Sequence, residues 1–573
     1  MQILSHEFVI GKNFKEIKKL KSLKEEVHSF DMLGEAARTP LQAKNYFDSY
    51  FNAIDEVGKI NSNKNLSNGV SIKISALHPR YEMRKINAVE SELIPKLIEL
   101  VNYAHSKNVE ITIDAEEQDR LSLSLYIIEK IAFEKKIKDW PGFGIALQAY
   151  GKRSFDVINW LNDHLNKRAG MHLRLVKGAY WDYEIKHAQV SGYEGYPVFS
   201  KKSLTDIAYI ACAKEILKNK NIFPKFATHN AHTISSIHHL GEGCEYEFQR
   251  LYGMGELLYK SASEVFDLKD KPSVYSPIGD YKDLLPYLVR RLLENGANSS
   301  FINRLLDSDT EPKWLSENPY KRIKSETKDI PLPKDIYKSR SNSSGMDITE
   351  RQNLKALKAN LKFYETKMVN AVSIYEGRKN LNKASEEVFS ISSGQQIGNV
   401  VFDEQTQLKE CLENNCSNEW SDTKTEQRSE ILNKIANDIE ENPYELIYYL
   451  INEAGKTIQN SIDEIREGVD FLRYYSYQIL SLSKKVELSG PTGEENIISY
   501  SPKGRFLCIS PWNFPVAILI GQISAALASG NNVMIKPSEH TSILGYLVTK
   551  RFHEAGVPIN ALELILGDGA YGE

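Results

Sequence analysis

One pattern repeats eight times in the first three hundred residues: a short apolar strand, a polar loop and an amphipathic helical stretch. Strands separated by helical patterns indicate parallel pairing, because each helix returns the chain to the starting edge of the sheet. Eight such units are the number that closes a (β/α)8 barrel. The predicted strands are residues 29–34, 70–76, 109–115, 144–149, 171–176, 224–228, 244–250 and 272–276.

Several of these strands alternate between apolar residues and polar or small ones. The outer face of a parallel barrel packs on helices, so the apolar rows should point outward and the polar rows should line the interior. Near the carboxyl-terminal mouth the polar rows would collect Lys73, Asp114, Gln148, Arg174, Thr228 and Gln249. A structural barrel fills this space with Val, Ile and Leu. Buried charges need a ligand or each other. We favour a functional mouth, with mutual ion pairing as the alternative.

The strand at 171–176 leads into a loop in which Lys177, Tyr180 and Trp181 converge around the small residue Gly178. This composition suits a flat, electron-rich or anionic ligand that lies against the backbone. The alternative is a buried strand with a lysine-tipped loop.

In the helical stretch 284–294, Tyr287, Arg290 and Arg291 share one patch, since they stand at i, i+3 and i+4. Adjacent arginines can grip a small carboxylate through charge-assisted hydrogen bonds. A solvated outer face of the helix is the alternative.

Two further motifs are weaker. His229 and His232 are three residues apart, but no third ligand is near in sequence, so hydrogen bonding is favoured over a metal site. The segment 253–255 is predicted to be a loop, not a G-x-G-x-x-G dinucleotide turn.

Charge and cysteine usage exclude some classes of function. A net charge of −4, without long runs of Lys and Arg, argues against a nucleic-acid partner. The five cysteines form no C-x-x-C pair, so neither a disulfide framework nor a zinc site is indicated. No signal peptide and no run near the roughly 18 apolar residues of a membrane span is present, so the prediction is a cytoplasmic protein.

Several motifs resemble the proline dehydrogenase domain of the bifunctional PutA family over about residues 5–310: Asp31-Met-Leu-Gly-Glu-Ala-Ala37, Ser71-Ile-Lys-Ile-Ser-Ala-Leu-His-Pro-Arg80, Asp114-Ala-Glu-Glu117, Arg174-Leu-Val-Lys-Gly-Ala-Tyr-Trp-Asp182, Thr228-His-Asn230 and Tyr287-Leu-Val-Arg-Arg-Leu-Leu-Glu294. The resemblance implies a distorted (β/α)8 barrel that holds FAD at its mouth. It also implies oxidation of L-proline to 1-pyrroline-5-carboxylate, by hydride transfer from proline Cδ to flavin N5 once the amine is unprotonated.

The resemblance further implies a role for individual residues. Arg174 would be the cation near flavin N5, and Glu35 would pair with Arg290 to close the site. Further flavin contacts would be Gln148, Lys177, Gly178, Tyr180, Trp181, Thr228, His229 and Asn230. The proline pocket would comprise Lys73, Asp114, Tyr275, Tyr287, Arg290 and Arg291, with both arginines on the carboxylate.

Residues 311–348 are rich in Pro, Ser, Lys and Asn, which predicts a linker between a barrel at 1–310 and a second region at 349–573. The second region begins with helical patterns, at about 349–370, 404–416, 426–440, 443–454 and 458–482. Alternating strands follow around 486–508. A strand from about Phe506, a helix to Ser529 and a strand at 532–539 then form one βαβ unit.

From about residue 375 onward the chain resembles the pyrroline-5-carboxylate dehydrogenase half of PutA, which has the aldehyde dehydrogenase fold, Rossmann-like in its NAD-binding part. The resemblance implies that Asn513 stabilises an oxyanion and that Lys536 and Glu539 hold the adenosine ribose of NAD. The family's cysteine nucleophile and glutamate base lie far downstream, and no cysteine follows Cys508. An incomplete region without aldehyde oxidation is therefore expected, with NAD bound only by a complete second domain.

Two other functions remain as alternatives. A Schiff-base barrel lyase could use Lys73 or Lys177, since desolvation can activate an interior lysine. An inactive remnant or an interaction module is the non-enzyme alternative. The resemblance leaves open a quinone acceptor and peripheral association with the inner face of a membrane, and the oligomeric state is open too.

Overall fold

The computed structural model describes residues 8–20, 22–64, 67–165, 168–268, 270–279, 287, 317–323, 330–378, 385–404, 406, 409 and 419–571. The chain divides into two compact units. The first comprises residues 1–187, 196–330 and 348–351, and the second comprises residues 188–195, 331–347 and 352–573.

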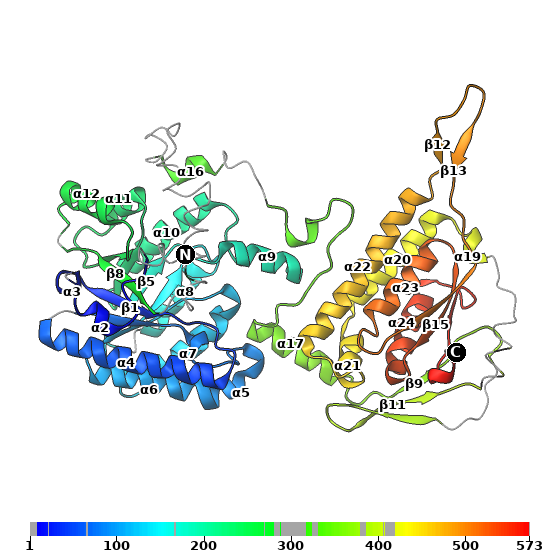
Figure 1. Ribbon diagram of the computed structural model, residues 1–573, viewed down its shortest axis with the longest axis horizontal. Coiled ribbons are helices and arrows are strands. Elements are labelled where there is room, and N and C mark those ends of the chain that lie inside the picture. The colour runs from blue at the N-terminus through cyan, green and yellow to red at the C-terminus, as the bar shows by residue number, and fades with distance from the viewer. Residues whose placement is uncertain are drawn as a thin grey trace. The chain divides into compact units, whose positions relative to one another are not determined.

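The first unit is built on a closed barrel of eight parallel strands in sequential order, in which β8 pairs with β1 (Figure 1). The strands are β1 His28–Met32, β2 Gly69–Ile72, β3 Glu110–Ile113, β4 Phe143–Gln148, β5 Met171–Val176, β6 Ile222–Ala227, β7 Glu247–Leu251 and β8 Ser273–Ile278. The predicted (β/α)8 barrel is therefore confirmed. The strand predicted at 70–76 is shorter, because residues Ile74–Ala76 form a 3-10 turn.

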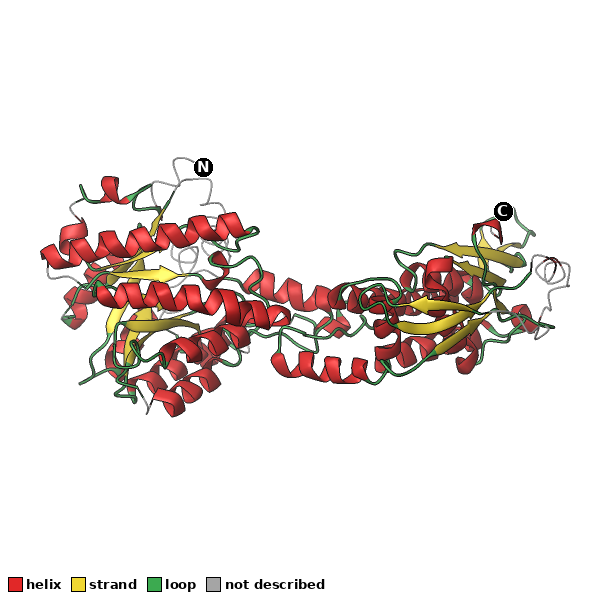
Figure 2. Cartoon of the chain, turned by 90° about the horizontal axis from the view of Figure 1, so that it is seen from below, coloured by secondary structure: helices red, strands yellow, loops and turns green. Residues whose placement is uncertain are grey.

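Helices surround the strands of the barrel (Figure 2). Those of eight residues or more are α4 Pro40–Lys64, α6 Ile94–Ser106, α7 Leu121–Ala132, α8 Ser154–Leu165, α9 Trp181–Ser191, α10 Lys202–Leu217, α11 Ala231–Leu240 and α12 Glu256–Phe266. Shorter helices are α2 Phe14–Ile17, α3 Ser22–Glu25, α5 Ile86–Ala88 and α16 Pro319–Arg322, and a π-helical turn spans Val89–Leu93.

Polar side chains fill the interior of the barrel from the mouth downward. Arg174 on β5 reaches Ser29 on β1 with an Nη2–Oγ distance of 2.7 Å, and Lys225 on β6 reaches Glu110 on β3 with an Nζ–Oε2 distance of 2.7 Å. None of these strands are neighbours in the barrel, so the contacts must cross its interior. The outward side chain Leu173 is fully buried. The predicted division into apolar outer rows and polar inner rows is confirmed on β5.

The helices of the second unit are α17 Arg351–Lys362, α19 Glu419–Asp422, α20 Thr425–Glu441, α21 Tyr444–Asn452, α22 Ile458–Leu482, α23 Ala517–Ala528 and α24 Ser542–Ala555. Its strands are β9 Val369–Val372, β10 Glu386–Phe389, β11 Gln396–Val401, β12 Val486–Leu488, β13 Asn496–Ile498, β14 Arg505–Ser510, β15 Asn532–Pro537 and β16 Leu562–Leu564. The strands form a parallel β14-β15-β16 sheet, a β10-β11-β9 sheet and the β12–β13 hairpin that projects in Figure 1.

The predicted βαβ unit is present as β14, α23 and β15, and the helix predicted at 458–482 is α22. The helix predicted at 349–370 ends at Lys362, and most of the one predicted at 404–416 lies outside the described residues.

The segment 331–347, which composition assigns to a linker, packs within the second unit. Asp470 on α22 accepts hydrogen bonds from Arg340 Nη1 at 2.6 Å and from Ser343 Oγ at 2.9 Å. Ser and Asn are common in linkers, but they also bond readily to nearby polar groups, so composition alone did not show this packing.

Candidate active site

The mouth of the barrel brings together two buried cations and two buried carboxylates. Arg174 on β5 donates from Nη1 to Asp114 Oδ1 at 2.7 Å, and from Nη2 to Ser29 Oγ and Ser71 Oγ. Lys73, just after β2, donates from Nζ to Asp31 Oδ1 at 2.6 Å. The four charged side chains balance one another, which offsets the cost of burying them.

Asp114 connects the two halves of this cluster. Its Oδ2 lies 3.6 Å from Lys73 Nζ and accepts a hydrogen bond from the Tyr275 hydroxyl at 2.7 Å. The Arg174 guanidinium also faces the Tyr275 ring, 5.2 Å from its centroid. Lys73, Asp114, Arg174 and Tyr275 are therefore brought together as predicted.

The pKa of Lys73 lies well above its ordinary value. Burial lowers this pKa, but the attraction of Asp31 and Asp114 outweighs it. For Asp31 the balance is reversed: burial raises its pKa more than Lys73 lowers it. Lys73 is therefore an ammonium ion at the mouth over the whole physiological pH range.

Mutual ion pairing, the alternative to a ligand at the mouth, is thus present in the structure. It does not use every donor, however. Arg174 Nε is buried and has no hydrogen-bond partner among the described residues. Gln249 donates a hydrogen bond to Ser273 Oγ at 3.0 Å. Of the predicted mouth residues, the structure brings Lys73, Asp114 and Arg174 into the ion-pair cluster.

The loops at the mouth are joined by side chains that bond to backbone. Gln148 Nε2 donates to Glu116 O at 2.7 Å, and Gln148 Oε1 accepts from Ala179 N at 3.2 Å. This leaves the Gln148 amide with one N–H and one acceptor site for a further partner. Ser75 Oγ accepts a hydrogen bond from Ala36 N, so the half-buried Glu35 lies on a loop that is bonded to the 3-10 turn after β2.

The predicted flavin loop is half-buried over residues 177–181. Gly178 has a φ of +139°, and a Cβ at this position would lie 2.4 Å from the Tyr150 ring, so only glycine fits. Lys177 pairs with Asp206 on α10, and Trp181 Nε1 donates to Phe199 O at 2.9 Å. Tyr180 lies between them in the same loop.

Thr228, His229 and Asn230 lie between β6 and α11 at the same mouth. His229 Nε2 accepts a hydrogen bond from Leu251 N at 3.0 Å, in agreement with the prediction that it acts through hydrogen bonds. Asn230 caps α11, with its Oδ1 accepting from Thr233 N at 2.9 Å. Thr228 Oγ1 accepts from Asn230 N at 3.1 Å.

Tyr287 is buried in a small cluster with Leu33, next to Tyr275. Arg290 and Arg291 lie outside the described residues, so the carboxylate grip remains a prediction.

Two acidic residues of the site were missed from the sequence. Asp31 follows the same alternation as Ser29 on β1, and this polar row could have identified it. Glu116 accepts a hydrogen bond from Ser75 N at 3.0 Å, and burial raises its pKa to about 7. No local pattern marks Glu116, because its environment comes from neighbouring loops.

In the second unit, Lys536 and Glu539 lie together at the end of β15, with an Nζ–Oε2 distance of 3.7 Å. Asn513 is exposed in the turn between β14 and α23. Cys508 on β14 is buried, and burial raises the pKa of its thiol, which is the opposite of what a nucleophile needs.

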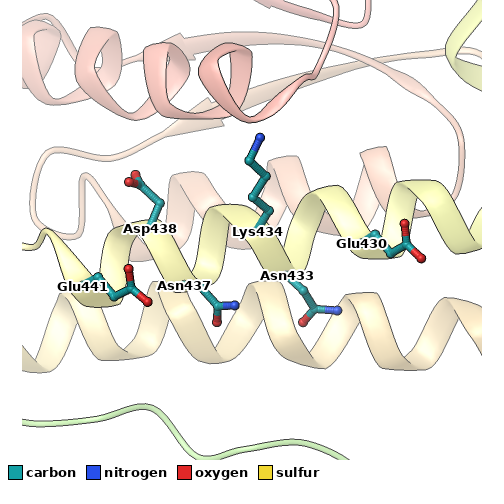
Figure 3. A pocket seen from close by; sticks show the side chains of 6 residues that line it. All are labelled: Glu430, Asn433, Lys434, Asn437, Asp438 and Glu441. Atoms are coloured by element: carbon teal, nitrogen blue, oxygen red, sulfur yellow. The ribbon is translucent and has the colours of Figure 1, made fainter.

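An open hollow runs along α20 and is lined by Glu430, Asn433, Lys434, Asn437, Asp438 and Glu441 (Figure 3). Asp438 is engaged by Arg551 at 2.7 Å. The labelled side chains spread along the helix without converging on a common point, so this hollow is not a candidate active site.

Comparison with known proteins agrees with this geometry. The family model for proline dehydrogenase matches residues 13–304, which is half of the chain, and the aldehyde dehydrogenase family model matches residues 379–573. The chain therefore belongs to the proline dehydrogenase family. The order of its two matched regions is that of the PutA-type bifunctional proteins.

Its relatives include bifunctional protein PutA of Salmonella typhimurium, 39% identical over 99% of this chain, and that of Escherichia coli, 40% identical over 99%. Both alignments cover 44% of the relative, so the chain spans about half the length of these proteins. A solved structure of proline utilization A with proline bound in remote sites has a TM-score of 0.87 and 37% identity, covering 99% of this chain and 56% of the other. That of Bdellovibrio bacteriovorus PutA inactivated by N-propargylglycine has a TM-score of 0.89 and 26% identity, covering 100% and 62%.

In the part of the chain that the structure describes, no helix has both the length and the apolar character needed to span a membrane.

Proposed function

We propose that this chain oxidises L-proline to 1-pyrroline-5-carboxylate with FAD bound at the mouth of the barrel. The observation that carries the proposal is the buried cluster of Lys73, Arg174, Asp114 and Tyr275 at this mouth, in a chain of the proline dehydrogenase family. Such a cluster is costly in a purely structural barrel, whose interior is normally apolar.

The residues at the mouth fit a flavin. The buried Arg174 Nε is a donor without a protein partner among the described residues, and an electron-rich ring is a suitable acceptor for it. The loop 177–181 is half-buried, so part of its surface is accessible to a ligand. Gln148, Lys177, Tyr180, Trp181, Thr228, His229 and Asn230 would complete the flavin contacts. A bound flavin supplies an acceptor for the hydride that leaves the substrate carbon next to the amine.

The remaining residues would bind and orient the substrate. Lys73 keeps a positive charge that attracts the proline carboxylate, and Arg290 and Arg291 would hold the same group. The rings of Tyr275 and Tyr287, close to Leu33, offer an apolar wall for the pyrrolidine ring. Glu35 would pair with Arg290 and exclude water. Orientation of this kind is the protein's main contribution when a cofactor carries the chemistry.

The Schiff-base alternative requires a neutral lysine amine. The raised pKa of Lys73 opposes this, because Asp31 and Asp114 stabilise the ammonium form. Lys177 is held in an ion pair with Asp206. We therefore expect borohydride treatment with a carbonyl substrate to trap no adduct on the barrel.

The proposal is tested by incubating the purified chain, reconstituted with FAD, with L-proline and a dye that accepts electrons. The expected product is two hydrogens lighter than proline by mass spectrometry, with one two-electron equivalent of dye reduced for each product molecule. Proline that remains unchanged, while the flavin stays bound, would refute the proposal and leave the non-enzyme alternative.

For residues 379–573 we propose that Lys536 and Glu539 hold the NAD ribose, and Asn513 an oxyanion, only when an aldehyde dehydrogenase domain is complete. The quinone acceptor and the peripheral membrane association remain predictions from the family, and the cytoplasmic location remains a prediction from the sequence. The oligomeric state stays open. The NAD affinity of the purified chain tests the proposal for Lys536 and Glu539. Tight binding of NAD by this region alone would contradict it.

A further inference from the structure

Asp31, at the end of β1, is the most deeply buried charge of the mouth. Its side chain is 1% exposed, and Asp31 was not among the residues expected to contact the substrate or the flavin. Its Oδ1 accepts a hydrogen bond from Lys73 Nζ at 2.6 Å. Lys73 is 6% exposed, so the lysine is the more accessible member of the pair. Asp31 can thus act on a ligand only through Lys73.

The other groups around Lys73 are engaged elsewhere. Asp114, after β3, accepts from both Arg174 and Tyr275 and lies 3.6 Å from Lys73 Nζ. Tyr275 on β8 is 3.5 Å from Lys73 Nζ, and its own proton goes to Asp114. Tyr50 on α4 accepts from the backbone N of Lys73 at 3.1 Å, which fixes the start of the side chain. Asp31 is therefore the closest anionic partner of the ammonium group.

We propose that Asp31 is a positioning residue that holds the Lys73 ammonium at the mouth, charged and correctly placed to bind the carboxylate of the substrate. This inference rests on the proposed function, since it assigns a positioning role to a residue of the same site. Asp31 thus gains a role in binding, although it does not itself contact the substrate.

The pH dependence of the site should reveal this role. In the wild-type chain the pKa of Lys73 is raised by Asp31 and Asp114 against the effect of burial, so Lys73 stays charged up to alkaline pH. In Asp31→Asn the strongest of these attractions is lost while burial remains, so the Lys73 pKa must fall. The charge of Lys73, and the affinity for a carboxylate, should then be lost as the pH rises.

The test uses the FAD-reconstituted full chain and tetrahydrofuran-2-carboxylate, a proline analogue with oxygen in place of the amine. This analogue has no titrating amine and cannot lose a hydride in the same way, so its binding reports on protein groups. Affinity is measured from the flavin spectrum between about pH 6 and about pH 10, a range that ends near the ordinary lysine pKa. Arginine stays charged throughout.

We expect the wild type to bind the analogue with little change across this range. Asp31→Asn should bind about tenfold more weakly at neutral pH and lose further affinity as the pH rises, with the KM for proline increasing more than kcat falls. The matched control is Asp55→Asn on α4, which removes a carboxylate paired with Lys59 and Lys107 outside the barrel. It should behave like the wild type.

A double-mutant cycle separates positioning from a general loss of structure. If Asp31 acts through Lys73, then adding Asp31→Asn to Lys73→Met should weaken binding no further. The double variant also removes both buried charges, so it remains informative if Asp31→Asn alone does not fold. Flavin content and the unfolding midpoint are recorded for each variant.

The inference would be overturned if Asp31→Asn bound the analogue with the same pH dependence as the wild type. It would also be overturned if Asp31→Asn weakened analogue binding equally in the wild-type and Lys73→Met backgrounds. Failure of the wild-type chain to oxidise proline would instead refute the proposed function. The two failures are distinguishable, because analogue binding does not require turnover.

Discussion

At the scale of the residue, the mouth of the barrel depends on a balance of four charges. Lys73 and Arg174 are each held within 2.7 Å of a carboxylate, and Asp114 joins the two pairs. Removing one member would leave its partner buried and unpaired, which costs more than the net value of the pair. Substitutions here should therefore affect stability as well as binding.

The prediction at this scale concerns Arg290 and Arg291. Replacing either with Met should raise the KM for proline while FAD remains bound, because both are expected to hold the substrate carboxylate. A charge-assisted hydrogen bond contributes about 1.5–3 kcal/mol, so each loss should lower kcat/KM by about 10 to 150 fold. The double variant should lose less than the product of the two effects, since both arginines share one carboxylate. An unchanged KM with normal flavin content would place the pair on a solvated face.

At the scale of the element, the loop after β5 must pass close to Tyr150. We predict that Gly178→Ala reduces the flavin content of the purified chain, because the new Cβ would meet the Tyr150 ring at 2.4 Å and the φ of +139° disfavours alanine. The matched control is Gly195→Ala, where a Cβ has no atom within 4 Å. Equal flavin content in both variants would show that the loop position does not matter for the cofactor.

A second element-scale prediction concerns the start of α24. Glu453, on the loop after α21, accepts hydrogen bonds from Ile543 N at 2.8 Å and Leu544 N at 2.9 Å. Burial raises its pKa from 4.5 to about 8, so the folded state binds its proton more tightly than the unfolded state does. The protonated Glu453 carboxyl group therefore contributes to the free energy of unfolding. This contribution is fully present below about pH 4.5 and is lost as the pH rises through about 8.

Glu453→Gln should remove this part of the pH dependence. Between about pH 5 and about pH 8, the free energy of unfolding of the wild type should fall by about 1–3 kcal/mol more than that of the variant. The measurement is denaturant unfolding of the second unit. Other buried acids, such as Glu184, act on both proteins equally, so the difference between the two curves isolates Glu453. Parallel curves would contradict the assignment.

The sequence predicted much of this architecture because periodicity is a local property. The alternation on β5 placed Arg174 inside the barrel and Leu173 outside, and the structure confirms both. The same alternation on β1 contains Asp31, but its importance comes from Lys73, 42 residues further along the chain. Likewise, the segment 331–347 has the composition of a linker, yet Asp470 engages it from α22. Contacts between distant segments are not encoded in any local pattern.

At the scale of the whole molecule, the chain has two compact units and two family matches, one for proline dehydrogenase and one for aldehyde dehydrogenase. We predict that the purified chain forms no NADH from glutamate semialdehyde and NAD. Cys508 is buried on β14, and burial raises the pKa of its thiol, which does not suit a nucleophile. NADH formation that Cys508→Ala abolishes would contradict this and identify Cys508 as the nucleophile.

The central claim is that the polar mouth of the barrel is a flavin site that oxidises proline. The most direct test is the absorption spectrum of the chain reconstituted with FAD, recorded without oxygen before and after addition of L-proline. We predict a flavin band that bleaches with L-proline and does not bleach with the oxygen analogue. A chain that retains no flavin after reconstitution, or a flavin band that L-proline leaves unchanged, would contradict the claim.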